Sequence, residues 1–402
     1  GRLFLFSIGG FTFVVFKTYK MNDMKGKQGL VCMGLLLVLS SCSCHTGKQI
    51  TASGLQRKDF QTEVNGQHTD LFTLSNKQGM EVCITNYGAR VVSILVPDRN
   101  GKREDVVCGF STITEYMEQR QNFGSTVGRY IGRILNARFT LDGVEYKLVP
   151  NNGKSGHISH GGNPGFADRI WKVEQADTHR VCLSYLSPDG ENGFPGNLKV
   201  TLVYSLGEDD NALDLTYEAT TDAPTVLNLS HHSFFNISGN FTKSVEDQQL
   251  WVDADRFTPY DDKKCVTGEY LPVAGTPLDF RMPHAIGECI DADHPQLKVV
   301  NGYDHTWELN TKGDDTRPAA WVYDPASGRK MEIFTTEPGM QIYTGNGLKG
   351  KMTGKGGMAY PFRSAVCFET MHFQDSPNHP GFPSTVLRPG EVFRSHTVYK
   401  FE

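Results

Sequence analysis

The sequence lacks the residue patterns of several functional classes. Lys and Arg together number 40 against 45 Asp and Glu, so no broad basic surface is available to neutralise a nucleic-acid backbone. There are 9 cysteines, but no CxxC pair, and the spacing of a zinc or dithiol redox site is therefore absent. Long stretches with helical periodicity are also missing. The sequence thus predicts no nucleic-acid partner and indicates no metal site.

A nucleotide-binding loop is missing as well. The glycine-rich segment TVGRYIGRILNARF at residues 126–139 does not contain the G-x-x-x-x-G-K-[ST] pattern, and no helix clearly follows it. The sequence therefore gives no reason to expect a phosphate-binding loop of that kind.

What is present favours a protein built from strands. The chain is 38% hydrophobic and 21% charged, has 42 glycines and is 11% aromatic, which suits many short strands joined by turns. The segment ARFTLDGVEYKLV reads as a hairpin that turns at Asp142-Gly143. ITEYMEQR and DFRMPHAI, at residues 113–120 and 279–286, fit short helical turns. With no shift in composition between residues 56 and 402, we expect one all-β domain, a large antiparallel β-sandwich.

The segment from Met21 to residue 41 has the layout of a secretory signal. A charged start with two lysines precedes the apolar run LVCMGLLLVL at residues 30–39, which is too short to span a bilayer comfortably. The next residues, LSSC, resemble a bacterial lipobox, so Cys42 is predicted to carry a lipid and become the mature N-terminus. We therefore expect an envelope protein that faces the periplasm or the cell surface and touches the membrane only through this anchor.

The residues on either side of this signal are assigned separately. Residues 1–20 lack an initiating Met and precede what reads as a complete signal, so they are interpreted as a mis-assigned start. Residues 42–55 are small and polar, as in a tether that holds a domain off a membrane. The folded domain is then expected at residues 56–402.

Two adjacent histidines lie in NLSHHSFFN at residues 228–236, which reads as an extended strand. Because side chains alternate faces along a strand, His231 lies in a mostly apolar row, whereas His232 shares its face with asparagines, a serine and Phe234. Such a polar row with an aromatic ring suits the lining of a cleft better than bulk solvent. A lone strand histidine is more often structural, but if one of the two acts chemically, alternation selects His232.

Several ordered segments identify a family. The chain resembles the aldose 1-epimerases, or galactose mutarotases, from about residue 86 to residue 391. The matching segments occur in the family's order and at similar spacing: NYGAR, GRYIGRI, SHGGNPGFADRIW, NLSHHSFFN, GYDH, YTGN and CFET. The resemblance implies a galactose mutarotase-like supersandwich with a shallow sugar cleft on a concave sheet, in agreement with the strand pattern.

The resemblance also implies roles for individual residues. Arg133 and His160 match the family's arginine and loop histidine, which hold sugar hydroxyls, and Asp304 matches its sugar-binding aspartate. His232 matches the general-acid histidine, and Glu369 matches the catalytic glutamate. Strand alternation and the resemblance therefore point to the same histidine.

One position departs from the family pattern. Many members carry Asn directly before the arginine, where this chain has Gly132. One polar contact to the sugar is then missing or supplied from elsewhere. The departure bears on substrate preference and leaves the acid–base chemistry intact.

The chemistry that these residues suit needs one base and one acid. Interconverting the anomers of an aldose removes the proton of the C1 hydroxyl while the ring oxygen is protonated. Glu369 lies in the apolar segment SAVCFETM, so burial is expected to raise its pKa toward the range of a useful base. His232 has an ordinary pKa of about 6.5 and can donate and recover a proton. No metal, nucleotide or other cofactor is required.

Taken singly, these residues also fit structural roles. Glu369 suits a buried carboxylate paired with an arginine, and Asp304 suits a turn-forming acid after Asn301-Gly302. The ordered match favours catalysis instead. Two further functions are compatible with this fold: a non-catalytic sugar-binding or sensing module, which would need neither His232 nor Glu369, and an epimerase of a phosphorylated sugar, which would need an extra basic cluster. The expected partner is a small aldose.

Overall fold

The computed structural model describes residues 2–8, 11–17 and 49–402. It divides into two compact units, Gly1–Thr46 and Gly47–Glu402. In the first unit, β1 (Arg2–Ile8) and β2 (Phe11–Lys17) pair as an antiparallel hairpin. The predicted signal peptide at residues 21–41 and the predicted lipidation site Cys42 lie outside the described residues. Among the helices that are described, none is long and apolar enough to cross a membrane.

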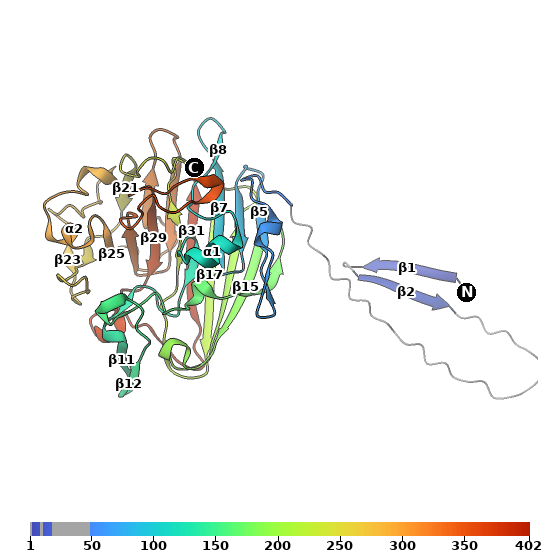
Figure 1. Ribbon diagram of the computed structural model, residues 1–402, viewed down its shortest axis with the longest axis horizontal. Helices are drawn as coiled ribbons and strands as arrows, with labels where there is room; N and C mark the ends of the chain where they lie inside the picture. The colour runs from blue at the N-terminus through green and yellow to red at the C-terminus, as the bar shows by residue number, and fades with distance from the viewer. Residues whose placement is uncertain (1, 9–10, 18–48) are drawn as a thin grey trace, which may run out of the picture. The chain divides into compact units, whose positions relative to one another are not determined.

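Antiparallel sheets make up the second unit, in which strands far outnumber helices (Figure 1). The nine-stranded sheet has the order β14 (Lys172–Ala176), β15 (Arg180–Ser187), β16 (Leu198–Leu206), β17 (Ala212–Thr221), β31 (Phe393–Phe401), β27 (Lys330–Thr335), β26 (Ala320–Tyr323), β21 (Gln249–Val252) and β24 (His284–Ala285). The six-stranded sheet has the order β20 (Phe234–Phe235), β29 (Val366–Met371), β28 (Gly339–Tyr343), β25 (Asp304–Glu308), β22 (Arg256–Thr258) and β23 (Leu271–Pro272).

Smaller sheets complete this unit. A four-stranded sheet has the order β5 (Leu71–Ser75), β6 (Glu81–Thr85), β7 (Arg90–Pro97) and β8 (Arg103–Asp105). The two-stranded pairs are β3 (Glu63–Val64) with β4 (Gln67–His68), β9 (Ser125–Val127) with β19 (Ser230–His232), β10 (Arg133–Ile134) with β13 (Ile158–Ser159), β11 (Arg138–Leu141) with β12 (Val144–Lys147), and β18 (Thr225–Val226) with β30 (Val386–Leu387).

The hydrophobic core lies between the nine-stranded and six-stranded sheets. In β16 every second side chain is buried, which is the alternation of a strand with one face on a core. One cluster of buried side chains joins Val200 and Leu215 of the large sheet to Ile342 and Phe368 of the six-stranded sheet. The expected large antiparallel β-sandwich is therefore confirmed.

The predicted hairpin and the first predicted helix are both present. The hairpin β11–β12 turns at Asp142 and Gly143, whose φ angles of 52° and 79° are the left-handed values that this tight turn needs. A helix at the expected ITEYMEQR is also confirmed, as α1 (Ile113–Gln119), with a capping box formed by Thr112 and Glu115.

The helical turn expected at residues 279–286 is wrong. Residues 279–283 form neither helix nor strand, residues 284–285 form β24, and only the last residue enters a short 3₁₀ helix, Ile286–Glu288. Pro283 disfavours a helical conformation in the residue before it. A helix that the sequence analysis missed, α2 (Pro295–Val300), lies close by; it starts at a proline and is capped by the side chain of His294. It lies at the edge of the unit (Figure 1).

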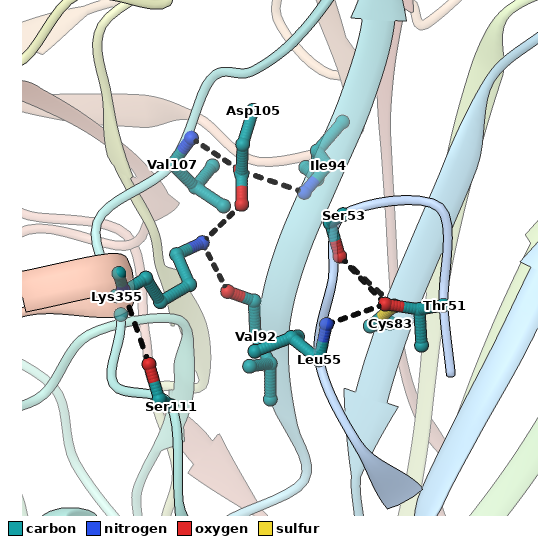
Figure 2. Close-up of polar contacts among 12 residues, drawn as sticks. Thr51, Ser53, Leu55, Cys83, Val92, Ile94, Asp105, Val107, Ser111 and Lys355 are labelled. Carbon is teal, nitrogen blue, oxygen red and sulfur yellow. Dashed lines mark hydrogen bonds and ion pairs between the residues drawn. The ribbon is translucent and has the colours of Figure 1, made fainter. Parts of the chain in front are cut away.

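Folded structure begins before the expected domain start at residue 56. Thr51 is buried, and its Oγ1 lies 2.9 Å from Ser53 Oγ, which in turn lies 3.9 Å from Cys83 Sγ of β6 (Figure 2). Small polar side chains here bond to one another and dock on the four-stranded sheet. The C-terminal part of the expected tether at 42–55 therefore belongs to the folded domain.

Candidate functional site

One pocket gathers the sequence-predicted site residues of the folded domain. It has a volume of about 240 Å³ and is lined by Arg133, His160, His232, Asp304 and Glu369. Other lining residues include Gly132, Phe234, Gln341, Tyr343 and Gln374. Residues that lie up to 236 positions apart in the sequence thus meet at one place, and their roles stay predictions to be tested.

The floor of the pocket is one face of the six-stranded sheet. Glu369 in β29 pairs with Gln341 in β28, and Tyr343 in β28 pairs with Asp304 in β25. Since side chains two apart on a strand share a face, these residues all project to the same side. Phe368 and Ile342, which alternate with them, point into the hydrophobic core. Strand alternation therefore separates the chemical face of this sheet from its packing face.

The two adjacent histidines lie on opposite faces, as alternation predicts. His232 Nε2 lies 3.4 Å from Glu369 Oε1, and the ring stacks on Phe234 with 5.1 Å between ring centroids. His231 instead places its Nε2 2.7 Å from Ser233 Oγ, and its ring contacts Tyr399 in the core. Only His232 lines the pocket.

Burial changes the protonation of the central pair in opposite directions. It raises the pKa of Glu369 well above its ordinary value, and the nearby Asp304 carboxylate adds to this effect. It lowers the pKa of His232 well below its ordinary value, with a further contribution from His160. Because each charged form is disfavoured, the pair is expected to hold one proton between its two groups at neutral pH.

His160 enters the pocket from a loop beside β10. Its φ of 52° is left-handed, and its Nδ1 accepts a hydrogen bond from the amide N–H of Gly132 at 3.4 Å. That contact assigns the ring proton to Nε2. Burial, together with the positive charge of Arg133, lowers the pKa of His160 to about 4, so the ring is neutral at pH 7. His160 therefore suits a neutral hydrogen-bond donor.

Arg133 and Asp304 add one charge of each sign. The guanidinium of Arg133 lies over the ring of Tyr260, 6.0 Å from its centroid. Burial opposes its charge, yet Tyr260 and Asp304 hold the pKa of Arg133 above its ordinary value. Asp304 Oδ1 accepts a hydrogen bond from Gln341 Nε2 at 2.6 Å. Burial raises the pKa of Asp304, while Arg133 and Gln341 act in the opposite direction.

All three glutamines that line the pocket were missed by the sequence analysis: Gln121, Gln341 and Gln374, of which the last two bond to each other. Gln374 Nε2 donates to Gln341 Oε1 at 3.3 Å and to the Tyr260 hydroxyl at 2.7 Å, and Gln374 Oε1 accepts from the amide N–H of Arg133 at 3.2 Å. Gln341 could have been found as a polar residue on an otherwise apolar strand, in phase with Tyr343. Gln374 follows β29 in a loop, where no periodicity marks it.

Gln374 also fills the space beside the position that departs from the family pattern. Gly132 has a φ of +76°, and a Cβ atom added there would lie 2.5 Å from Gln374 Cγ. Such a distance is too short for two carbon atoms, so a side chain at residue 132 and the present position of Gln374 exclude each other.

The chain shows extensive similarity to known proteins. Residues 70–400 match the family described as Aldose 1-epimerase. The galactose mutarotase of Bos taurus is 40% identical over 331 residues, which cover 82% of this chain and 93% of that protein. The galactose mutarotase of Sus scrofa is 38% identical over 330 residues (82% and 93%), and the aldose 1-epimerase of Escherichia coli strain K12 is 36% identical over 339 residues (84% and 96%).

Solved structures agree with these sequence matches. An aldose epimerase homologue from C. elegans superposes with a TM-score of 0.76 at 31% identity and covers 83% of this chain and 99% of its own. The galactose 1-epimerase of Lactobacillus acidophilus superposes with a TM-score of 0.74 at 28% identity, covering 85% and 97%.

Proposed function

Because the chain belongs to the aldose 1-epimerase family, we propose that it interconverts the α and β anomers of free hexoses such as glucose and galactose in this pocket. The observation that carries the proposal is the buried pair of His232 and Glu369, 3.4 Å apart and flanked by polar side chains suited to sugar hydroxyls. The reaction is an isomerisation, and its acid and base come from this chain.

Ring opening needs two proton transfers around one carbon atom. Glu369 removes the proton of the C1 hydroxyl as His232 donates a proton to the ring oxygen, the bond from C1 to the ring oxygen breaks, and C1 becomes an aldehyde. Rotation about the bond from C1 to C2 presents the other face, and the reversed transfers close the ring. Both reacting oxygens are bonded to C1, so acid and base must be neighbours, as Glu369 and His232 are.

The single proton of the pair suits this cycle. Before ring opening the reacting state has ionised Glu369 and protonated His232, and after ring opening both groups are neutral. Burial favours the neutral forms of both groups. The pocket therefore stabilises the protonation state that accompanies the open-chain sugar. When the ring closes, Glu369 returns its proton to the oxygen on C1 and His232 takes one back from the ring oxygen.

The remaining lining residues are proposed to hold the sugar. Arg133 supplies donors, Asp304 supplies acceptors and the neutral ring of His160 supplies one donor, which together match neighbouring hydroxyls that each donate and accept. Phe234 offers an apolar surface to the C–H groups of the sugar. By fixing C1 against the pair, these contacts supply orientation as well as affinity.

Polarimetry on freshly dissolved α-glucose and α-galactose tests the proposal. The purified protein is expected to accelerate the approach of the optical rotation to its equilibrium value. A non-catalytic sugar-binding module would bind sugar without changing this rate, and an epimerase of phosphorylated sugars would accelerate only the phosphorylated substrate. Either outcome would replace the present proposal.

We predict that Gly132→Asn raises KM by about tenfold or more, because the new side chain must displace Gln374 and its bond to Arg133. Asn tolerates the left-handed backbone at this position, so the effect should come from the side chain. In the double variant Gly132→Asn/Gln374→Ala the space is free, and KM should fall back toward that of Gln374→Ala alone. KM is measured by steady-state anomer exchange on the wild type, the two single variants and the double variant. If Gly132→Asn raised KM equally with and without Gln374, a side chain at residue 132 would not compete with Gln374 for space.

We further propose that the domain is attached to the bacterial cell envelope through lipid on Cys42, on the strength of the lipobox-like LSSC that follows a charged and apolar signal. Cys42→Ala is predicted to abolish lipid attachment and leave either unprocessed precursor or a released form. Metabolic labelling with a palmitate analogue in a bacterial host measures this directly. Absence of label in the wild type, or label that survives the substitution, would refute the anchor.

A further inference from the structure

Three different metal-binding side chains converge beneath the sugar pocket. A ring nitrogen of His232, the thiol sulfur of Cys367 and a carboxylate oxygen of Glu369 all lie within 4.8 Å of one another, and all three residues are buried. Within residues 49–402, Cys367 forms no disulfide. The mechanism proposed above uses His232 and Glu369 but gives Cys367 no part.

The strand register explains this convergence. Phe234 of β20 pairs with Cys367 of β29 in antiparallel fashion, so His232 lies two residues beyond Phe234 on the side where Glu369 lies two residues beyond Cys367. Side chains two apart on a strand share a face. The pairing of β20 with β29 therefore aligns the cluster, and His232 itself is held by the pairing of β19 with β9.

We propose that this cluster binds a thiophilic divalent cation, of which Zn²⁺ is the reference case, and that the bound ion inhibits the enzyme. Zn²⁺ takes nitrogen, sulfur and oxygen ligands together, and three protein ligands leave its fourth position for water or a sugar hydroxyl. The binding site stands on the geometry alone; its inhibitory effect rests on the proposed acid–base function of His232 and Glu369.

Charge and size both favour such an ion. A thiolate and a carboxylate balance a doubly positive ion, and with neutral His232 the buried complex carries no net charge, which limits the cost of placing it away from water. Zinc ligands at about 2.0–2.3 Å from the ion lie about 3.3–3.8 Å apart in a tetrahedron. The three ligand atoms lie within 4.8 Å of one another, so side-chain movements of about 1 Å bring them to that spacing.

The same ligands select against other cations. Mg²⁺ and Ca²⁺ require six or more oxygen ligands, whereas this cluster offers one carboxylate among a thiol and an imidazole. Softer ions such as Zn²⁺ and Cd²⁺ accept this donor set. A bound ion occupies the lone pairs of Glu369 and His232 that must exchange protons with the sugar. Binding of one ion therefore blocks both the base and the acid.

The inhibition should appear as a loss of anomer exchange on adding micromolar Zn²⁺ to tag-free protein, restored by a chelator, with Mg²⁺ having no effect. Calorimetric titration should give one Zn²⁺ per chain. Cys367→Ala is expected to keep the basal exchange rate and to weaken Zn²⁺ binding by at least about tenfold. Cys83→Ala, which removes a buried thiol of β6 outside the cluster, is the matched control and should bind Zn²⁺ as the wild type does.

A thiolate ligand can also be detected without enzyme activity. Co²⁺ bound in place of Zn²⁺ should give a sulfur-to-cobalt charge-transfer band in the near ultraviolet that is lost in Cys367→Ala and, should that variant fold poorly, in Cys367→Ser. No stoichiometric binding by the wild type, or equal binding by Cys367→Ala, would overturn the site. A protein that binds Zn²⁺ through Cys367 but has no exchange activity would retain the site and overturn the proposed function instead.

Discussion

Glu369→Gln is expected to bind sugar with near-wild-type affinity and to lose interconversion by about 10²- to 10⁴-fold. The amide keeps the shape of the carboxylate and still accepts a hydrogen bond, but it cannot take up the C1 hydroxyl proton at neutral pH. Calorimetric sugar affinity and anomer exchange by NMR, measured on the same sample, separate binding from chemistry.

Two further variants serve as controls for this result. Arg133→Ala and Asp304→Ala remove contacts proposed to hold hydroxyls, so they should raise KM and lower kcat only to the degree that those contacts orient C1. A Glu369→Gln protein with near-normal exchange would show that Glu369 is not the base. The mechanism would then be abandoned, although the fold and the family would stand.

The sequence predicted most clearly what depends on local pattern. Alternation along NLSHHSFFN placed His231 and His232 on different faces, and the turn chemistry of Asp142-Gly143 placed a hairpin, because both are properties of a few consecutive residues. The gathering of Arg133, His160 and Asp304 in one pocket came instead from ordered motifs, since no local pattern specifies which distant strands meet.

What the sequence did not predict depends on contacts between distant residues. The side chain of Gln374 occupies space that is free because residue 132, which lies 242 positions earlier in the sequence, is glycine. The residues adjacent to Gln374 in the sequence give no sign of this contact. Cys367 joins the metal-binding cluster through the pairing of β20 with β29. The missed helix α2 is short and packs through Leu297 and Val300, so propensity alone gives little signal.

Burial of the acid–base pair complicates the interpretation of substitutions at Glu369 and His232. Glu369 lies on a strand that is buried along its whole length, and His232 lies beside it with 5% of its surface exposed. Substitutions there change both proton transfer and packing. A test of the acid therefore needs a neighbour of similar burial that takes no part in the chemistry, and His231, with 2% of its surface exposed, meets that condition.

His232→Asn is expected to lose about 10²- to 10⁴-fold in turnover, whereas His231→Asn should keep most of its turnover and mainly lose stability. Asn cannot protonate the ring oxygen, so the first variant lacks the acid. The second loses the contact between His231 Nε2 and Ser233 Oγ and leaves a cavity beside Tyr399, at a cost of about 1–3 kcal/mol. Anomer exchange by NMR and urea denaturation on both proteins provide the comparison. If His231→Asn were well folded and inactive while His232→Asn remained active, the assignment of the acid from strand alternation would be wrong.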